Sequence, residues 1–251
     1  MDAACTVEIA AKSFNVIQKP DNYDEKIAED ILYGEQTDKD VLTELDNLPD
    51  IIVILNETFY DLSLGADIET DEDYLQEIHS MGNLVSGYAA APSAGGGTNS
   101  SEYELLTSNS LEIMPNITPF NVLNMNGAES VVSYLNGLGY KTIAAHSGAG
   151  SNYSRNRAYA EMGFDQIHFL EVEFYHDRYF AEDSSLYDNL IRWYEVQCED
   201  AEPIFMYMLT IQNHGGWNLN DSVYDTVHVL NAEGEYTEEM NEYLTCIKNS
   251  D

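Results

Sequence analysis

The stretch Ile51-Ile52-Val53-Ile54-Leu55 runs directly into Asn56-Glu57-Thr58, and this junction decides the predicted fold. An unbroken aliphatic run of this length is typical of a strand buried on both faces of a parallel sheet. In open α/β sheets, ligands bind beyond the carboxyl ends of the strands. The stretch therefore predicts a strand that delivers Glu57 to a binding site. A helix-capping role for this acid is equally compatible with its position.

Two later stretches repeat the pattern. Residues 141–145 (KTIAA) predict a second strand that ends at His146, and residues 203–211 (PIFMYMLTI) predict a third that leads to His214. Helical patterns separate the strands, so the chain is predicted to have an α/β fold with a mainly parallel sheet and helices on both faces. Polar residues at the ends of three successive strands predict that Glu57, His146 and His214 share one cleft.

A glycine-rich loop, AGGGTNSS (residues 94–101), precedes a helix predicted over residues 102–108 and follows a short strand predicted over residues 84–90. Glycines permit positive φ, so the loop can aim Thr98 and several N–H groups outward. A hydroxyl near a helix N-terminus suits a nucleophile that attacks a phosphate or sulfate. Thr98 is therefore the candidate nucleophile, and a merely flexible connection is the alternative.

A second polar loop covers residues 146–155 and has no apolar stripe. It contains Tyr153 and ends at Arg155, one of only four arginines in the chain. An arginine beside His146 is suited to clamp a tetrahedral anion. The alternative is that Arg155 pairs with one of the many acidic residues.

The charge of the chain excludes some classes of partner. The formal net charge is −35, which disfavours binding to nucleic acids and to anionic surfaces. Only six of the 45 acidic residues lie between residues 84 and 170, so an anionic substrate can approach this central part. The three cysteines, Cys5, Cys198 and Cys246, form no paired metal or redox motif.

No signal peptide or membrane-spanning stretch is predicted, because the N-terminus is acidic and the apolar runs are short. Any membrane anchor is therefore expected outside this sequence. Residues 1–49 are expected to form a helical lead-in, and residues 50–251 are expected to form the catalytic domain.

Five motifs in this order resemble the lipoteichoic acid synthase and phosphoglycerol transferase group of the alkaline phosphatase and sulfatase superfamily. They are IIVILNETF (51–59), GGGTNSSEYE (95–104), GYKTIAAH (139–146), RNRAYAEMGFD (155–165) and TIQNHGG (210–216). The resemblance implies that Glu57 is a metal ligand and that Thr98 is the nucleophile and also touches the metal. It further implies a substrate-binding set that holds the phosphate or the glycerol head group, and these residues are His146, Arg155, His214 and Tyr153. The implied cofactor is Mn²⁺, or Mg²⁺ in its place.

The resemblance implies transfer of phosphoglycerol from phosphatidylglycerol to a glycerol-phosphate polymer or glycan through a threonine-linked intermediate. The parent protein is then expected at the extracellular face of a bacterial cell membrane. The group completes its metal site with an Asp-His pair, which this sequence lacks, so the chain is expected to be an inactive fragment with the C-terminal part of the fold missing.

Other functions remain open at this point. They are a phosphodiesterase, a phosphoethanolamine transferase, a sulfatase and a non-catalytic module that binds glycerol phosphate. A sulfatase is disfavoured because no Cys/Ser-x-Pro/Ala-x-Arg motif surrounds Thr98.

Overall fold

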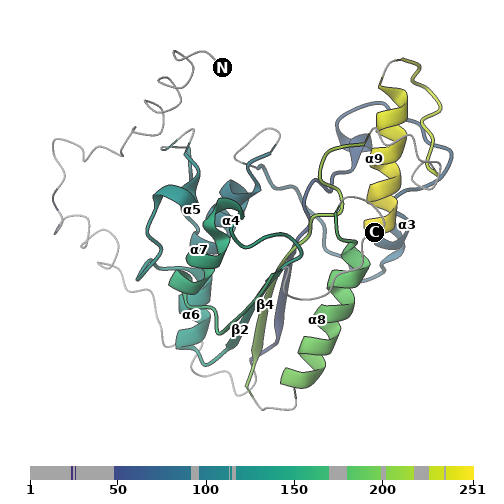
Figure 1. Cartoon of the computed structure of the whole chain (residues 1–251). Coiled ribbons are helices and arrows are strands. Elements are labelled where there is room, and N and C mark those ends of the chain that lie inside the picture. Colours follow the sequence, from purple (N-terminus) through teal and green to yellow (C-terminus); the bar gives the residue numbers. More distant parts are fainter. Residues whose placement is uncertain are drawn as a thin grey trace, which may run out of the picture.

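The computed structural model describes residues 24, 26, 48–91, 96–112, 114, 117–169, 180–198, 202–217, 226–234 and 236–251. The helical lead-in predicted over residues 1–49 lies almost entirely outside these residues. Figure 1 shows a central sheet with helices on both sides and a separate lobe built around α3 (Gln76–Ser80) and α9 (Thr237–Ser250). The predicted α/β architecture is confirmed.

The sheet has four strands in the order β1-β4-β2-β3, and every pair is parallel. The bounds are Ile51–Leu55 for β1, Lys141–His146 for β2, Gln166–His168 for β3 and Ile204–Leu209 for β4. Leu55 of β1 and His146 of β2 both stand in register with Leu209 at the end of β4. The carboxyl ends of the three predicted strands therefore meet at one edge of the sheet.

Helices cover the two faces of the sheet unequally. One face packs on a core that includes residues of α4 (Thr98–Thr107), α5 (Pro119–Val122), α6 (Val131–Gly137) and α7 (Arg155–Met162). The other face packs on α8 (Asp183–Gln197), whose Leu186 and Leu190 join Met206 and Met208 of β4. Apolar residues on both sides of β4 explain why its sequence shows no alternation.

The prediction that β1 is buried on both faces is wrong. Its burial alternates along the strand, and Ile52 and Ile54 are 45% and 44% exposed. β1 lies at an edge of the described sheet, beside β4. On that face the α8 core covers β4 and β2 but not β1. The aliphatic run was therefore a correct signal for a strand but not for its place in the sheet.

The segments around the glycine loop also differ from expectation. Residues 84–90 were predicted as a strand, but the structure places them in irregular conformation without a ladder partner. The following helix, α4, begins at Thr98 itself rather than at residue 102. Gly96 and Gly97 have φ values of 73° and 75°, and this left-handed turn allows the helix to begin directly after the loop.

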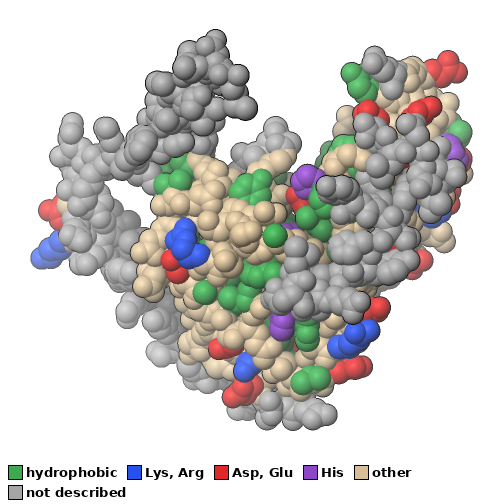
Figure 2. Space-filling view, in the orientation of Figure 1, with side chains coloured by type: hydrophobic (Ala, Val, Ile, Leu, Met, Phe, Trp, Pro, Cys, Tyr) green, Lys and Arg blue, Asp and Glu red, His purple; other side chains and the backbone are tan. Residues whose placement is uncertain are grey.

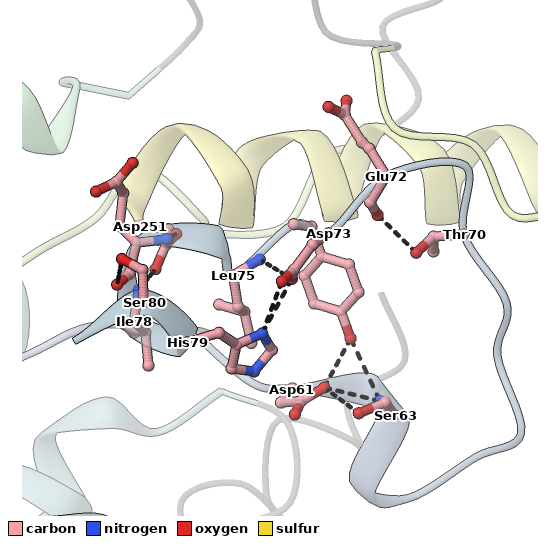
Figure 3. Close-up of polar contacts among 12 residues, drawn as sticks. Asp61, Ser63, Thr70, Glu72, Asp73, Leu75, Ile78, His79, Ser80 and Asp251 are labelled. Atoms are coloured by element: carbon pink, nitrogen blue, oxygen red, sulfur yellow. Dashed lines mark hydrogen bonds and ion pairs between the residues drawn. The ribbon is translucent and has the colours of Figure 1, made fainter. Parts of the chain in front are cut away.

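The lobe beside the sheet has its own small core, which joins residues of segment 59–78 to Leu244 and Ile247 of α9. Polar contacts tie the same parts together (Figure 3). The Asp251 carboxylate accepts hydrogen bonds from the main-chain N–H groups of Glu77 and Ile78, at 2.6 and 3.1 Å. The end of α9 is thereby fixed to the start of α3. No helix in the described ranges combines the length and apolar character that a membrane span requires.

Candidate active site

The candidate site lies where the strands end. Thr210 follows β4, and its main-chain N–H donates to the Leu55 carbonyl at 3.2 Å. Its hydroxyl accepts the main-chain N–H of Glu57 at 3.0 Å and donates to Asn56 Oδ1 at 2.9 Å. Glu57 is therefore held by its backbone, which leaves its carboxylate to interact with other groups.

The start of α4 brings Thr98 to this carboxylate. The Thr98 hydroxyl donates a hydrogen bond to Glu57 Oε1 at 2.6 Å, although the two residues are 41 positions apart in the sequence. Thr98 is the first residue of α4 and therefore lies at the positive end of the helix dipole. A hydroxyl bonded to a carboxylate at a helix N-terminus is the arrangement expected of an activated nucleophile.

A buried ion pair lies one turn further along α4. Arg155 Nε and Nη2 both donate to Glu102 Oε1, at 2.9 and 2.6 Å, and the two side chains are only 4% and 0% exposed. The Tyr159 hydroxyl donates to the other oxygen, Glu102 Oε2. Burial alone would lower the pKa of Arg155, but the charge and hydrogen bonds of Glu102 raise it above its ordinary value. Arg155 is therefore a permanent cation.

Tyr153 covers this cation. Its ring centroid lies 5.0 Å from the guanidinium carbon of Arg155, within the range of a cation–π contact. Tyr153 and Ser154 have φ values of 54° and 57°, which are uncommon for residues other than glycine. Such backbone strain is concentrated at functional sites.

His146 is buried at the end of β2. Its Nδ1 lies 3.0 Å from the Leu209 carbonyl, which can only accept, so Nδ1 carries a proton. Nε2 is buried and has no hydrogen-bond partner among the residues that the structure describes. Burial, helped by the positive charge of Arg155, lowers the pKa of His146 to about 3. Gly148 lies against this ring, since a Cβ at that position would stand 2.4 Å from Nε2.

His214 differs from His146. It lies beyond the end of β4, is exposed, and packs its ring 4.8 Å from that of Phe180. No hydrogen bond among the described residues joins it to Thr98, Glu57 or Arg155. The structure thus joins Glu57 to Thr98 and places Arg155 beside Tyr153. The charge of Arg155 also acts on His146. His214 instead packs against Phe180.

Several residues of this region escaped the sequence analysis. Glu102 is one of them. It lies four residues after Thr98 on the same helix, and this spacing was the available signal that the two side chains share one face. The others form a buried polar chain. Asn56 Nδ2 donates to the Ser250 hydroxyl at 2.9 Å, Ser250 donates to Asp183, and burial raises the pKa of Asp183. Nothing in the spacing of these residues indicates the contact.

The donor set for a metal is small. In the described ranges, no group of three or more His, Cys, Asp or Glu side chains could hold an ion. Glu57 and Thr98 supply two oxygen donors of the kind that Mn²⁺ or Mg²⁺ prefers, but firm binding needs more protein ligands than this. These two residues alone do not make a complete metal site.

Charge is distributed unevenly over the surface around these elements. Figure 2 shows mostly hydrophobic and uncharged side chains across the middle of the visible face, with acidic side chains mainly toward its edges. This view agrees with the low acid content of residues 84–170.

The chain has a parallel sheet with helices on both faces, and Thr98 at the start of a helix bonds to Glu57 at the strand ends. This arrangement corresponds to an α/β fold of the alkaline phosphatase and sulfatase kind. The chain belongs to the sulfatase family, whose family model matches residues 49–251. The resemblance inferred from the five motifs is thereby confirmed at the level of family and fold.

Solved structures with this fold include two from the predicted group. The chain resembles the Streptococcus pyogenes phosphoglycerol transferase GacH, in complex with sn-glycerol-1-phosphate, with a TM-score of 0.73 and 21% identity over 92% of this chain and 63% of that one. It resembles the Listeria monocytogenes lipoteichoic acid synthase LtaP with a TM-score of 0.65 and 15% identity, over 80% and 49% of the two chains. At these identities the likeness concerns the fold.

One relative is closer in sequence. A Rhizobium meliloti (strain 1021) protein named for cyclic β-1,2-glucan modification is 29% identical over 200 residues. The match covers 78% of this chain but only 30% of the rhizobial protein. The chain thus spans less than two thirds of the length of each relative described here.

Proposed function

We propose that this chain carries the nucleophile and anion-binding groups of a phosphoglycerol transferase. The observation that carries the proposal is the 2.6 Å hydrogen bond from Thr98 to Glu57 at the start of α4. The fold shared with GacH and LtaP supports it, as does the sn-glycerol-1-phosphate in the GacH complex. Residues 50–251 are the proposed catalytic domain, preceded by a lead-in over residues 1–49.

The proposed reaction proceeds in two displacements. Thr98 Oγ1 attacks the phosphorus of phosphatidylglycerol while its proton passes to Glu57 Oε1, and the bond from phosphorus to the diacylglycerol oxygen breaks. Diacylglycerol leaves with the proton that Glu57 took from Thr98, and phosphoglycerol remains on Thr98. A hydroxyl of a glycerol-phosphate polymer or glycan then attacks the same phosphorus, and Thr98 regains its proton.

Four further residues would form the substrate-binding set. Arg155 would neutralise a phosphate oxygen, with Tyr153 packed on its guanidinium. His146 and His214 would contact the phosphate or glycerol head group. His146 is neutral at pH 7, and with Nδ1 donating to Leu209 its Nε2 is an acceptor, so a glycerol hydroxyl suits it better than a phosphate oxygen.

The resemblance also implies a divalent cation, Mn²⁺ or Mg²⁺, which would polarise the phosphoryl group when bound. Glu57 and Thr98 are the proposed ligands. Because two donors hold a cation weakly, we expect low turnover by this chain alone. We further propose that the parent protein acts at the outer face of a bacterial membrane. An anchor outside this sequence would hold it there.

Mass spectrometry of the chain after incubation with phosphatidylglycerol and Mn²⁺ tests the proposal. A phosphoglycerol adduct on Thr98 is expected, and Thr98→Ala should abolish it. Thr107→Ala is a matched control, because Thr107 ends the same helix. Among the described residues, its hydrogen bonds join nearby groups of its own segment, the Tyr103 carbonyl and the Asn109 N–H. Release of glycerol phosphate without an adduct would indicate a phosphodiesterase, and reversible binding alone would indicate a non-catalytic module.

A further inference from the structure

Helix α4 carries two groups of the candidate site on one face. Thr98 and Glu102 are four residues apart, so they lie above one another, separated by one turn or about 6 Å along the axis. Thr98 faces Glu57, and Glu102 faces Arg155. The helix therefore links the position of the nucleophile to the position of the arginine.

The contacts of Glu102 leave it little freedom. Arg155 and Tyr159 are also four residues apart, on α7, and both donate to this carboxylate, one to each oxygen. The Glu102 side chain is fully buried. The hydrogen bonds of Arg155 to Glu102 use Nε and Nη2, and Nη1 makes no hydrogen bond to any described residue.

We propose that Glu102 is the positioning residue that orients Arg155, so that its free guanidinium edge binds the phosphate of a glycerol phosphate substrate beside Thr98. This inference rests on the proposed function. An arginine held through Nε and Nη2 keeps its plane fixed, so less freedom is lost when an anion binds. Without Glu102, the guanidinium would lose both its counter-charge and its orientation.

Helix α7 supplies a matched control pair. Arg157 Nη1 lies 3.0 Å from Glu161 Oε2, and these side chains are 40% and 23% exposed. This pair forms within one helix, and its other hydrogen bonds to described residues join main-chain groups of Phe120, Leu123 and Met125, none of which lies in α4. Glu161→Gln therefore removes the same kind of charge, a carboxylate paired with an arginine of α7, without removing a partner of Arg155.

The test is a titration of the ¹⁵N-labelled chain with sn-glycerol-1-phosphate, followed through the arginine Nε–H signals in NMR spectra. Four arginines give four such signals, assigned by Arg155→Lys and Arg157→Lys. For Glu102→Gln we expect at least tenfold weaker binding and a broadened Arg155 signal, and Glu102→Asp should recover part of the affinity. Glu161→Gln should bind within twofold of the wild type.

A second comparison separates positioning from loss of stability. Leu106→Ala, a core change on the same helix, should lower the melting temperature while the folded protein keeps its affinity. In an Arg155→Lys background, Glu102→Gln should cause little further loss.

Wild-type affinity in Glu102→Gln, or an equal loss in both backgrounds, would overturn the inference and leave the proposed function standing. A wild-type chain that binds no sn-glycerol-1-phosphate would overturn the proposed function, and this inference with it.

Discussion

The candidate site has an open half and a buried half, and each contains one glutamate. In the open half, Thr98 is the one described residue that donates a hydrogen bond to the Glu57 carboxylate, while the Glu57 backbone is fixed by Thr210. In the buried half, the Glu102 carboxylate receives donors from both Arg155 and Tyr159. The difference indicates a division of roles: Glu102 is fully used by the fold, whereas Glu57 keeps oxygen lone pairs for a proton or a ligand.

The largest effect on stability is expected when the Glu102–Arg155 ion pair of the buried half is removed. Glu102→Leu should lower the free energy of unfolding by about 3–5 kcal/mol, because it leaves the buried Arg155 without a counter-charge. Glu57→Leu should cost less than about 1 kcal/mol, since no buried charge depends on it. Urea denaturation of both variants measures the difference. Equal losses would contradict the division between the two halves.

The second effect is a dependence of the unfolding free energy on pH. It arises from His146, which is buried near Arg155. The pKa of His146 is lowered from 6.5 to about 3, so the unfolded chain binds this proton more readily than the folded one. The contribution of His146 is complete above pH 6.5 and is lost as the pH falls toward 3. Between pH 7 and pH 5 it should amount to about 2 kcal/mol of unfolding free energy.

Denaturation at these two pH values, with variants of each histidine, measures this contribution. His146→Gln should show a smaller fall in stability than the wild type, by about the amount given above. His214→Gln should behave as the wild type does, because His214 is exposed. Equal pH dependence in all three proteins would refute the assignment to His146.

The sequence predicted the open half better than the buried half. Thr98 and Glu57 were placed by rules that depend only on local order, namely that polar residues follow strands and that hydroxyls suit helix starts. The pairing of Glu102 with Arg155 depends on how α4 packs against α7, 53 residues along the chain, and no local pattern specifies that. Arg155 does pair with an acid, but this acid is the buried Glu102 rather than one of the acidic surface residues, and the proposed role of Arg155 in substrate binding stays a prediction.

The sheet shows the same limit. β4 and β1 have equally apolar sequences, yet β4 is buried throughout and Ile52 and Ile54 of β1 are exposed. Strand formation follows from residue type, which the sequence displays. Position within the sheet follows from which helix covers which strand, and this depends on the whole chain.

A third prediction concerns Thr210, whose hydroxyl holds the backbone of Glu57 in the open half. Thr210→Val removes the hydroxyl that accepts the Glu57 N–H and donates to Asn56, and it should cost about 1 kcal/mol of unfolding free energy. Thr210→Ser keeps the hydroxyl and should retain most of the stability. Thermal melting compares the two. If serine were as damaging as valine, packing of the methyl group rather than the hydrogen bonds would explain the role of Thr210.

The smallest effect on stability is expected at the proposed nucleophile, Thr98. Thr98→Val keeps the shape of the side chain and removes one hydrogen bond to a carboxylate that remains accessible to water, so the unfolding free energy should change by less than about 0.5 kcal/mol. The phosphoglycerol adduct should nevertheless disappear. A large loss of stability would mean that the Thr98–Glu57 contact holds the fold together, as Glu102 and Arg155 do. A small loss together with a lost adduct would mean that this hydroxyl contributes to the chemistry rather than to the stability of the fold.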